Sequence, residues 1–262
     1  MAVDLESIVA AKGGKLPRPV IALMKRILHL DFLNAYFVKG YEGVEFCTGA
    51  LEYLDVKVDV EGLENVPDDG TLYTFVSNHP LGGIDGVALG SIVGGHFGGK
   101  VRYLVNDILM HIKGLAPICV PINKTGGQSR NLPALINEAF QSDNQMILFP
   151  AGLCSRRIDG RIQDLPWGKA FINKSVGTGR SVVPVHFIAE NSKRFYRFAD
   201  FCKKMRFKFN FAMVLLPDEM YRNRHTTFRI IFGKPIPPES FDSSRSPIEW
   251  AQLVREEVYK LQ

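Results

Sequence analysis

The sequence feature that most constrains the fold is an alternation of short apolar runs with helix-like segments along residues 56–232. The apolar runs have the length of strands and are rich in the β-branched and aromatic residues that favour strands. Parallel strands need long crossover connections, and helices placed between strands supply them. The alternation therefore predicts an α/β fold, with a mostly parallel central sheet that is flanked by helices.

The individual elements can be placed along the chain. Strands are expected at residues 56–60, 71–76, 101–105, 118–122, 145–149, 181–187, 207–216 and 226–232, with helices at 85–93, 128–142 and 167–176. A last helix is expected after Ser246, because Ser246 and Glu249 can form a capping box and Pro247 suits the first helical position.

The first part of the chain has a different character. Residues 1–53 read as helical, and residues 17–28 place their apolar side chains on one face and Lys25 and Arg26 on the other. Two interpretations stay open for this helix: it packs on the core, or it lies in a membrane interface. Because the pattern changes near residue 54, we expect an N-terminal helical segment, 1–53, and an α/β domain, 54–262.

Charge and composition limit the surroundings of the protein. The net charge of +5 favours anionic partners such as lipid head groups, nucleic acid or acidic carrier proteins. The acidic N-terminus lacks the apolar core of a signal peptide, and no apolar run approaches the ~20 residues that span a bilayer. None of the four cysteines has zinc-like spacing, so no metal is expected.

A histidine and an aspartate lie close together in the Gly-rich loop that follows the predicted strand 71–76. His79 and Asp85 can form a general-base unit, in which the carboxylate fixes the imidazole tautomer and stabilises its charged form. The backbone amides near Gly82 and Gly83 are candidates to hold a developing oxyanion. The alternative is a structural glycine turn that contains an incidental histidine.

Four segments of the chain together resemble the phospholipid and glycerol acyltransferase family, which includes the lysophospholipid acyltransferases. Asn78-His79 with Asp85 resembles the NHxxxxD block, and Phe149 to Arg156 resembles the FPEGTRS block. Residues 117–124 and 183–185 are similar to the intermediate block and the late Pro-containing strand block. The resemblance covers about residues 56–235, and the order and spacing of the blocks carry it.

The resemblance implies a role for each matching residue. His79 would be the general base, Asp85 would orient it, and the donor would be an acyl thioester of acyl carrier protein or coenzyme A. No bound cofactor is implied. The residues expected to bind substrate are Asn78, Gly82, Gly83, Lys124, Pro150, Ala151, Gly152, Ser155, Arg156 and Arg157.

The chain departs from the family pattern in ways that bear on the acceptor. Five residues separate His79 from Asp85 instead of four, and Ala151 and Lys124 replace a glutamate and an arginine. A variant branch with HPLGGxDG and FPAGLxSR blocks, which this chain resembles, is associated with bacterial ornithine and glycine lipids. We therefore expect O-acylation of a lyso-aminolipid. Acylation of 1-acylglycerol-3-phosphate, a non-catalytic lipid-binding role and a thioesterase-like hydrolysis are the alternatives.

A basic and aromatic stretch over residues 193–209 indicates an interaction surface. It holds seven basic residues, one acidic residue and six aromatic residues. Basic side chains are drawn to anionic head groups, and aromatic rings favour the membrane interface. We expect this stretch to meet the cytoplasmic face of the inner membrane or acyl carrier protein, and not nucleic acid. The residues assigned to this contact are Lys193, Arg194, Arg197, Lys203, Lys204 and Arg206.

Overall fold

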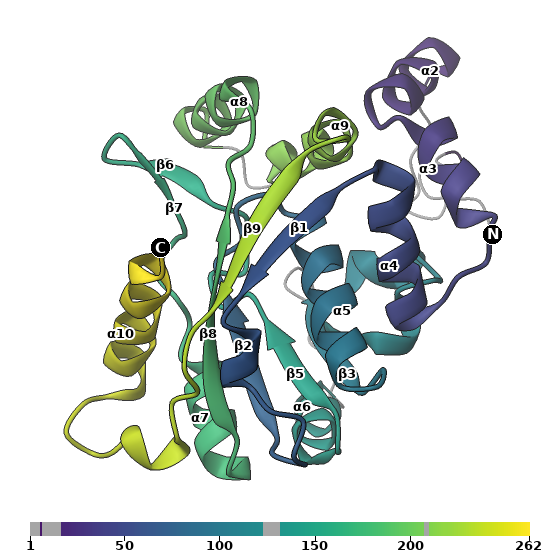
Figure 1. Ribbon diagram of the computed structural model, residues 1–262. Coiled ribbons are helices and arrows are strands. Elements are labelled where there is room, and N and C mark those ends of the chain that lie inside the picture. The colour runs from purple at the N-terminus through teal and green to yellow at the C-terminus, as the bar shows by residue number, and fades with distance from the viewer. Residues whose placement is uncertain (1–5, 7–16, 123–131, 207–209) are drawn as a thin grey trace.

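The computed structural model describes residue 6 and residues 17–122, 132–206 and 210–262. Its centre is a seven-stranded sheet in the order β1-β9-β8-β2-β5-β3-β4, with helices on both faces (Figure 1). The strands are β1 (Lys57–Glu61), β2 (Tyr73–Ser77), β3 (Val101–Asn106), β4 (Cys119–Ile122), β5 (Gln145–Leu148), β8 (Ser181–Ile188) and β9 (Thr227–Phe232). A separate antiparallel hairpin consists of β6 (Arg156–Ile158) and β7 (Arg161–Gln163).

Nine α-helices lie in the described part of the chain. They are α2 (Arg18–Ile27), α3 (Leu30–Phe37), α4 (Gly43–Leu54), α5 (Ile84–His96), α6 (Leu132–Gln141), α7 (Ala170–Thr178), α8 (Lys193–Lys204), α9 (Leu216–Arg222) and α10 (Pro247–Lys260). Short 3-10 turns are η1 (Leu63–Asn65), η2 (Asp107–His111), η3 (Ala116–Ile118), η4 (Phe211–Leu215) and η5 (Pro238–Ser240). The capping box of α10 is present, with Ser246 and Glu249 in their predicted roles.

The sheet is mostly parallel, as the sequence predicts. β1 runs parallel to β9, β2 to both β5 and β8, and β3 to both β4 and β5. The β8–β9 pair is antiparallel. Parallel strands of this kind are buried on both faces, which explains why the sequence of β2 is apolar without a clean alternation.

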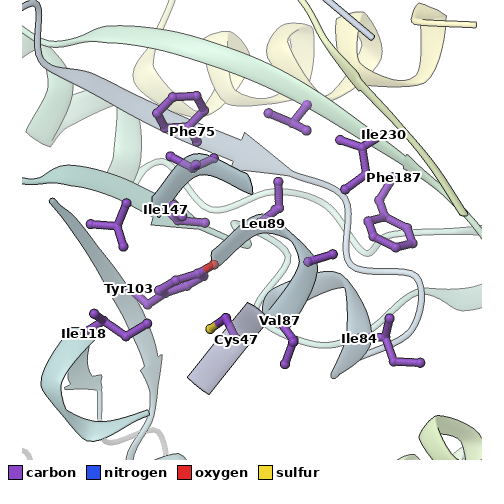
Figure 2. Packing of buried hydrophobic residues seen from close by; sticks show 14 of the residues in the cluster. Cys47, Phe75, Ile84, Val87, Leu89, Tyr103, Ile118, Ile147, Phe187 and Ile230 are labelled. Carbon is purple, nitrogen blue, oxygen red and sulfur yellow. The ribbon is translucent and has the colours of Figure 1, made fainter. Parts of the chain in front are cut away.

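Two apolar layers cover the sheet. On β2, Phe75 belongs to the cluster that includes α4 and α5, whereas Val76 belongs to the cluster that includes α6, α7 and α10. Because neighbouring strand residues point to opposite faces, these helices lie on opposite sides of the sheet (Figure 1). Figure 2 shows residues of the first layer, among them Cys47 of α4, Leu89 of α5 and Tyr103 of β3.

Helices from the N-terminal segment take part in this first layer. Tyr36 of α3 and Phe46 of α4 are buried in the same cluster as the sheet. The helices α4 and α5 approach closely, since a side chain at Gly90 or Gly94 would overlap Cys47 or Val44. The division of the chain into segments 1–53 and 54–262 stays a prediction.

Some predicted elements differ from the structure. The strand expected at 207–216 is wrong for its described part, because residues 211–215 form the 3-10 turn η4 and α9 begins at Leu216. Pro217, Asp218 and Glu219 explain this, since proline and acidic residues favour the first turn of a helix. The helix expected at 167–176 begins at Ala170, and the first residues of the one expected at 128–142 lie outside the described residues.

Candidate active site

Three parallel strands end at one edge of the sheet and bring the family-like blocks together. β2 leads into the His79 loop, β5 leads into Phe149, and β8 leads toward Asn191. Because β2 runs parallel to both β5 and β8, their carboxyl ends lie side by side. In α/β folds this edge is where ligands and reactive groups usually gather.

The centre of this edge is a contact between His79 and Asp85. The Nδ1 atom of His79 lies 2.9 Å from the Oδ2 atom of Asp85. The side chain of Asp85 is fully buried, whereas that of His79 is 18% exposed and so remains accessible to a substrate. The predicted pairing of these two residues is therefore present in the structure, despite the additional residue between them.

The Asp85 carboxylate is held by a ring of donors. Asp85 lies in the first turn of α5, where the helix dipole favours a negative charge. The left-handed conformation of Gly82, with φ +74°, lets the loop curl around the carboxylate. Its donors, at 2.9–3.1 Å, are His79 Nδ1 and the backbone N–H groups of Leu81, Gly82, Gly83 and Gly86.

This ring corrects one expectation for the glycine amides. The sequence suggested that the N–H groups near Gly82 and Gly83 hold a developing oxyanion, but both donate to Asp85. That interpretation of the two amides is wrong in this structure. They fix the carboxylate that orients the histidine, because an ionised carboxylate has room for several donors on its two oxygens.

The electrostatics of the pair define the tautomer of His79. Burial alone would raise the pKa of the Asp85 carboxyl, but the positive charge and hydrogen bond of His79, together with the backbone donors, lower it below its usual value. An ionised carboxylate accepts only, so Nδ1 of His79 carries the hydrogen. Nε2 is then the basic ring nitrogen, which is the arrangement that a general base requires.

The second block packs directly on the first. The ring of Phe149 stacks on the imidazole of His79, with centroids 4.1 Å apart. The backbone N–H of Ser155 donates to the carbonyl oxygen of His79 at 2.8 Å. The block therefore holds the histidine ring and main chain. Pro150 and Ala151 lie in the turn just after β5, and the carbonyl of Pro150 accepts from Gly168 at 3.0 Å.

The predicted anion-binding residues are placed in different ways. Arg156 turns back onto its own block, because its Nη1 donates to the carbonyl oxygens of Cys154 at 2.6 Å and of Ser155 at 3.1 Å. Arg157 pairs with Asp200 at 3.1 Å. Lys124 lies outside the described residues. Asn78 is buried and bonds both backbone groups of Phe187 in β8, so it anchors the loop to the sheet.

Three residues near His79 belong to the candidate site but were not predicted individually from the sequence. Phe149 was noted only as part of a block, and Asp164 and Asn191 carried no motif. Asp164 accepts a hydrogen bond from the backbone N–H of His79 at 3.2 Å. The Nδ2 of Asn191 donates to the carbonyl of Pro80 at 3.0 Å. The Leu-Pro-Trp-Gly run after Asp164 is the one sequence feature that could have pointed to Asp164, because Trp167 bonds to Asp164.

The predicted interaction surface is a helix. The first part of the stretch forms α8, and residues 207–209 lie outside the described residues. Two large apolar side chains, Phe201 and Met205, are about half exposed beside the basic ones. The exposed basic residues of this helix and the turn after it are Lys193, Arg194, Arg197, Lys203, Lys204 and Arg206.

Two kinds of feature are absent from the described residues. Within residues 17–122, 132–206 and 210–262, no group of three His, Cys, Asp or Glu side chains is arranged to hold a metal ion. In the same part of the chain, no helix has both the length and the apolar character needed to cross a bilayer.

The comparison of the sequence with known proteins identifies the class of enzyme. Residues 7–262 match the family described as acyltransferase, so the chain belongs to that family and is an O-acyltransferase. Relatives in Bacteroides thetaiotaomicron and Phocaeicola vulgatus, both named lyso-glycine lipid O-acyltransferase, are each 53% identical over 265 residues. The alignments cover 99% of this chain and 97% and 95% of the relatives.

The fold has a counterpart among solved structures. The crystal structure of the 1-acyl-sn-glycerophosphate (LPA) acyltransferase PlsC from Thermotoga maritima matches with a TM-score of 0.50 and 18% identity. The match covers 97% of this chain and 86% of that chain. At this identity the likeness concerns the fold, and it confirms the predicted architecture.

Proposed function

We propose that this enzyme transfers a fatty acyl group from an acyl thioester to the hydroxyl of a membrane lysolipid, with lyso-glycine lipid as the preferred acceptor. The observation that carries the proposal is the His79–Asp85 contact at 2.9 Å, in a chain that is 53% identical to two enzymes named for this acceptor. The donor is acyl carrier protein or coenzyme A loaded with the acyl chain, and acyl carrier protein is the preferred candidate.

The proposed reaction needs one base and no covalent acyl-enzyme. Nε2 of His79 takes the proton of the acceptor hydroxyl while the hydroxyl oxygen attacks the thioester carbonyl. When the carbon–sulfur bond breaks, the thiolate leaves and takes the proton from the imidazolium. Asp85 holds the Nδ1 hydrogen and stabilises the imidazolium in between, so the products are an ester and a free thiol.

The second block supports an acceptor without a phosphate group. Ala151 packs against the apolar cluster of the second layer, where the family pattern has a carboxylate. The guanidinium of Arg156 is engaged with its own main chain and with Oδ1 of Asn210 at 3.2 Å. A guanidinium that already donates to these oxygens offers fewer donors for the bidentate contact that a phosphate prefers. A lyso-aminolipid, which presents its hydroxyl on an acyl chain, fits this block better.

We propose further that α8 brings the enzyme to an anionic membrane surface as a peripheral protein on the cytoplasmic face of the inner membrane. Its exposed basic side chains and half-exposed Phe201 and Met205 combine charge attraction with apolar insertion. The amphipathic helix α2 lies at the same end of the molecule as α8 (Figure 1). None of the described α2 residues is buried, and Leu23 is 58% exposed, which favours the interfacial interpretation of α2.

The test is acyl transfer by the purified enzyme and by His79→Ala, with lyso-glycine lipid, lyso-ornithine lipid and lysophosphatidate offered separately. Loss of the general base lowers kcat by about 10²–10⁴-fold. His225→Ala is the matched control, because it removes an exposed histidine that pairs with Asp55. Full activity of His79→Ala would refute the mechanism. Preference for lysophosphatidate would refute the acceptor, and release of free fatty acid without acyl-lipid would indicate a hydrolase.

A further inference from the structure

Asp164 is a second buried carboxylate that contacts His79, in addition to Asp85. It follows β7, and its side chain is fully buried. Oδ1 accepts from the backbone N–H of His79 at 3.2 Å and from the hydroxyl of Ser155 at 2.6 Å. Oδ2 accepts from the indole N–H of Trp167 at 3.0 Å. Asp85 therefore contacts the ring of His79, whereas Asp164 contacts its main chain.

Both backbone polar groups of His79 are fixed by the same unit. Its N–H donates to Asp164, and its carbonyl accepts from the N–H of Ser155 at 2.8 Å. Ser155 is in turn bonded to Asp164 through its hydroxyl. The three residues are thus joined by a closed ring of hydrogen bonds, which connects the His79 loop to the second block. A shift of Asp164 would change the position of the His79 peptide relative to that block.

Helix α10 holds Asp164 in place. The backbone N–H of Asp164 donates to the hydroxyl of Tyr259 at 2.8 Å, and its carbonyl oxygen accepts from Nη2 of Arg255 at 2.7 Å. Tyr259 and Arg255 both project from α10, which packs on the sheet through β8. The carboxylate is thus supported by a rigid element and not by the loop that it holds.

Burying a carboxylate at this position costs free energy, which indicates that the carboxylate has a role there. Burial raises the pKa of the Asp164 carboxyl, although hydrogen bonds from Ser155, Trp167 and His79 oppose that rise. The three side-chain contacts are all made by donors, which is the pattern that an ionised carboxylate prefers. An amide cannot reproduce it, because one of its two ends would present N–H to another N–H.

We infer that Asp164 is a positioning residue for acyl transfer: it sets the main chain of His79 against the second block, while Asp85 sets the ring. The inference rests on the proposed role of His79 as general base. A reacting group displaced by about 1 Å can lose on the order of 10²-fold in rate. Loss of the Asp164 contacts should change kcat more than KM, because Asp164 is buried and holds the base instead of the substrate.

The test compares Asp164→Asn, Trp167→Phe and the double variant in the acyl-transfer assay, with kcat, KM and thermal unfolding measured for each. Asp164→Asn should lower kcat by roughly 10–100-fold with KM nearly unchanged. In the double variant the indole N–H is absent, so the amide oxygen can face His79 and Ser155 while its nitrogen faces the phenyl ring. We expect the double variant to recover most of the kcat that the single Asp164→Asn loses.

Two controls separate positioning from loss of folding. Ser175→Ala removes another buried hydrogen bond, from Ser175 of α7 to Thr74 of β2 at 2.8 Å, which involves neither His79 nor Asp164. It should lower the melting temperature but leave kcat unchanged. If Asp164→Asn fails to fold, Ser155→Ala keeps the carboxylate and removes its shortest contact, and it should lower kcat with little change in KM.

The outcomes distinguish this inference from the proposed function. If His79→Ala is inactive while Asp164→Asn and Ser155→Ala keep wild-type kcat, the positioning role is refuted and the proposed function stands. If the kcat of the double variant falls by the product of the two single-variant factors, Asp164 acts only through packing and the inference fails. If His79→Ala is fully active, the proposed function fails and the inference fails with it.

Discussion

At the scale of single residues, the carboxylate of Asp85 explains how the loop tolerates an additional residue between histidine and aspartate. The added length is taken up by the turn at Gly82 and Gly83, whose N–H groups both bond to Asp85. The loop closes around the carboxylate, so the distance to His79 stays at 2.9 Å. The spacing along the chain is therefore a poor guide to the spacing in space.

Replacing Asp85 with asparagine should impair both catalysis and stability. The amide no longer favours the correct tautomer of His79, and we expect kcat to fall by about 10²–10⁴-fold. Its nitrogen also faces backbone N–H groups, which costs about 1–3 kcal/mol of unfolding free energy. Steady-state kinetics and urea unfolding measure the two effects, with Asp59→Asn on the exposed side of β1 as control. Near-normal kcat in Asp85→Asn would contradict the role of Asp85.

Residue types and spacing predicted part of the candidate site but not all of it. His79, Asp85 and the Phe149–Arg156 block were found because they lie in short segments with recognisable order. Asp164 and Asn191 were not, because their contacts with the His79 loop join residues 85 and 111 positions apart in the chain. The hydrogen bond from Arg156 to the main chain of its own block could not be predicted either, since it depends on how that turn folds.

At the scale of elements, α9 is tied to the N-terminal helices through His29. Nε2 of His29 lies 2.8 Å from Oδ1 of Asp218, and its ring stacks on Tyr221 with centroids 3.8 Å apart. α9 in turn adjoins the His79 loop, because Leu216 and Met220 fill the space where Gly82 and Gly83 lack side chains. The junction therefore links the first helices to the His79 loop.

The His29 junction predicts a dependence of stability on pH. Burial lowers the pKa of His29, and the charges of Arg222, Arg224 and Arg194 lower it further. The folded protein thus prefers neutral His29, and the unfolded chain binds the proton first as the pH falls below about 6.5. Stability should be highest above that pH and decrease on acidification until the folded-state pKa is passed. His29→Gln should flatten this dependence in urea unfolding between about pH 7 and pH 5. An unchanged slope would contradict the assignment.

The close contact between α4 and α5 makes a second prediction at this scale. A side chain at Gly94 would overlap Val44, whereas one at Gly95 would meet nothing within 4 Å. Gly94→Ala should therefore destabilise the fold by about 1–3 kcal/mol through overpacking. Gly95→Ala is the matched control and should be neutral or stabilising by up to about 1 kcal/mol, because alanine favours helices. Equal unfolding free energies for the two variants would contradict the packing.

The elements themselves were largely predictable, and the exceptions have local causes. The capping box of α10 and the runs of the parallel strands carry their signals within a few residues. The run at 211–216 is apolar like a strand, but it precedes Pro217 and acidic residues that start α9. Its apolar side chains serve another purpose: Ala212, Leu215 and Leu216 pack with α8. Apolar content alone does not separate these two outcomes.

At the scale of the whole molecule, α8 and the turn after it expose both basic and apolar side chains. Lys203→Gln with Lys204→Gln should weaken binding to anionic vesicles by about 2 kcal/mol in total, or roughly 30-fold. Lys260→Gln on α10 is the control, since that exposed lysine lies on a different helix and should leave binding unchanged. Sedimentation with phosphatidylglycerol vesicles measures the effect. Equal binding by all variants would remove α8 from the membrane contact.

The most direct test of the central claim is lipid mass spectrometry of a strain that lacks the gene and is complemented with either wild-type enzyme or His79→Ala. We predict that the deletion strain loses diacylated glycine lipid and accumulates the lyso form. Wild-type enzyme should restore the diacylated lipid, and His79→Ala should not. Normal glycine lipids in the deletion strain, accumulation of lysophosphatidate instead, or full restoration by His79→Ala would contradict the claim.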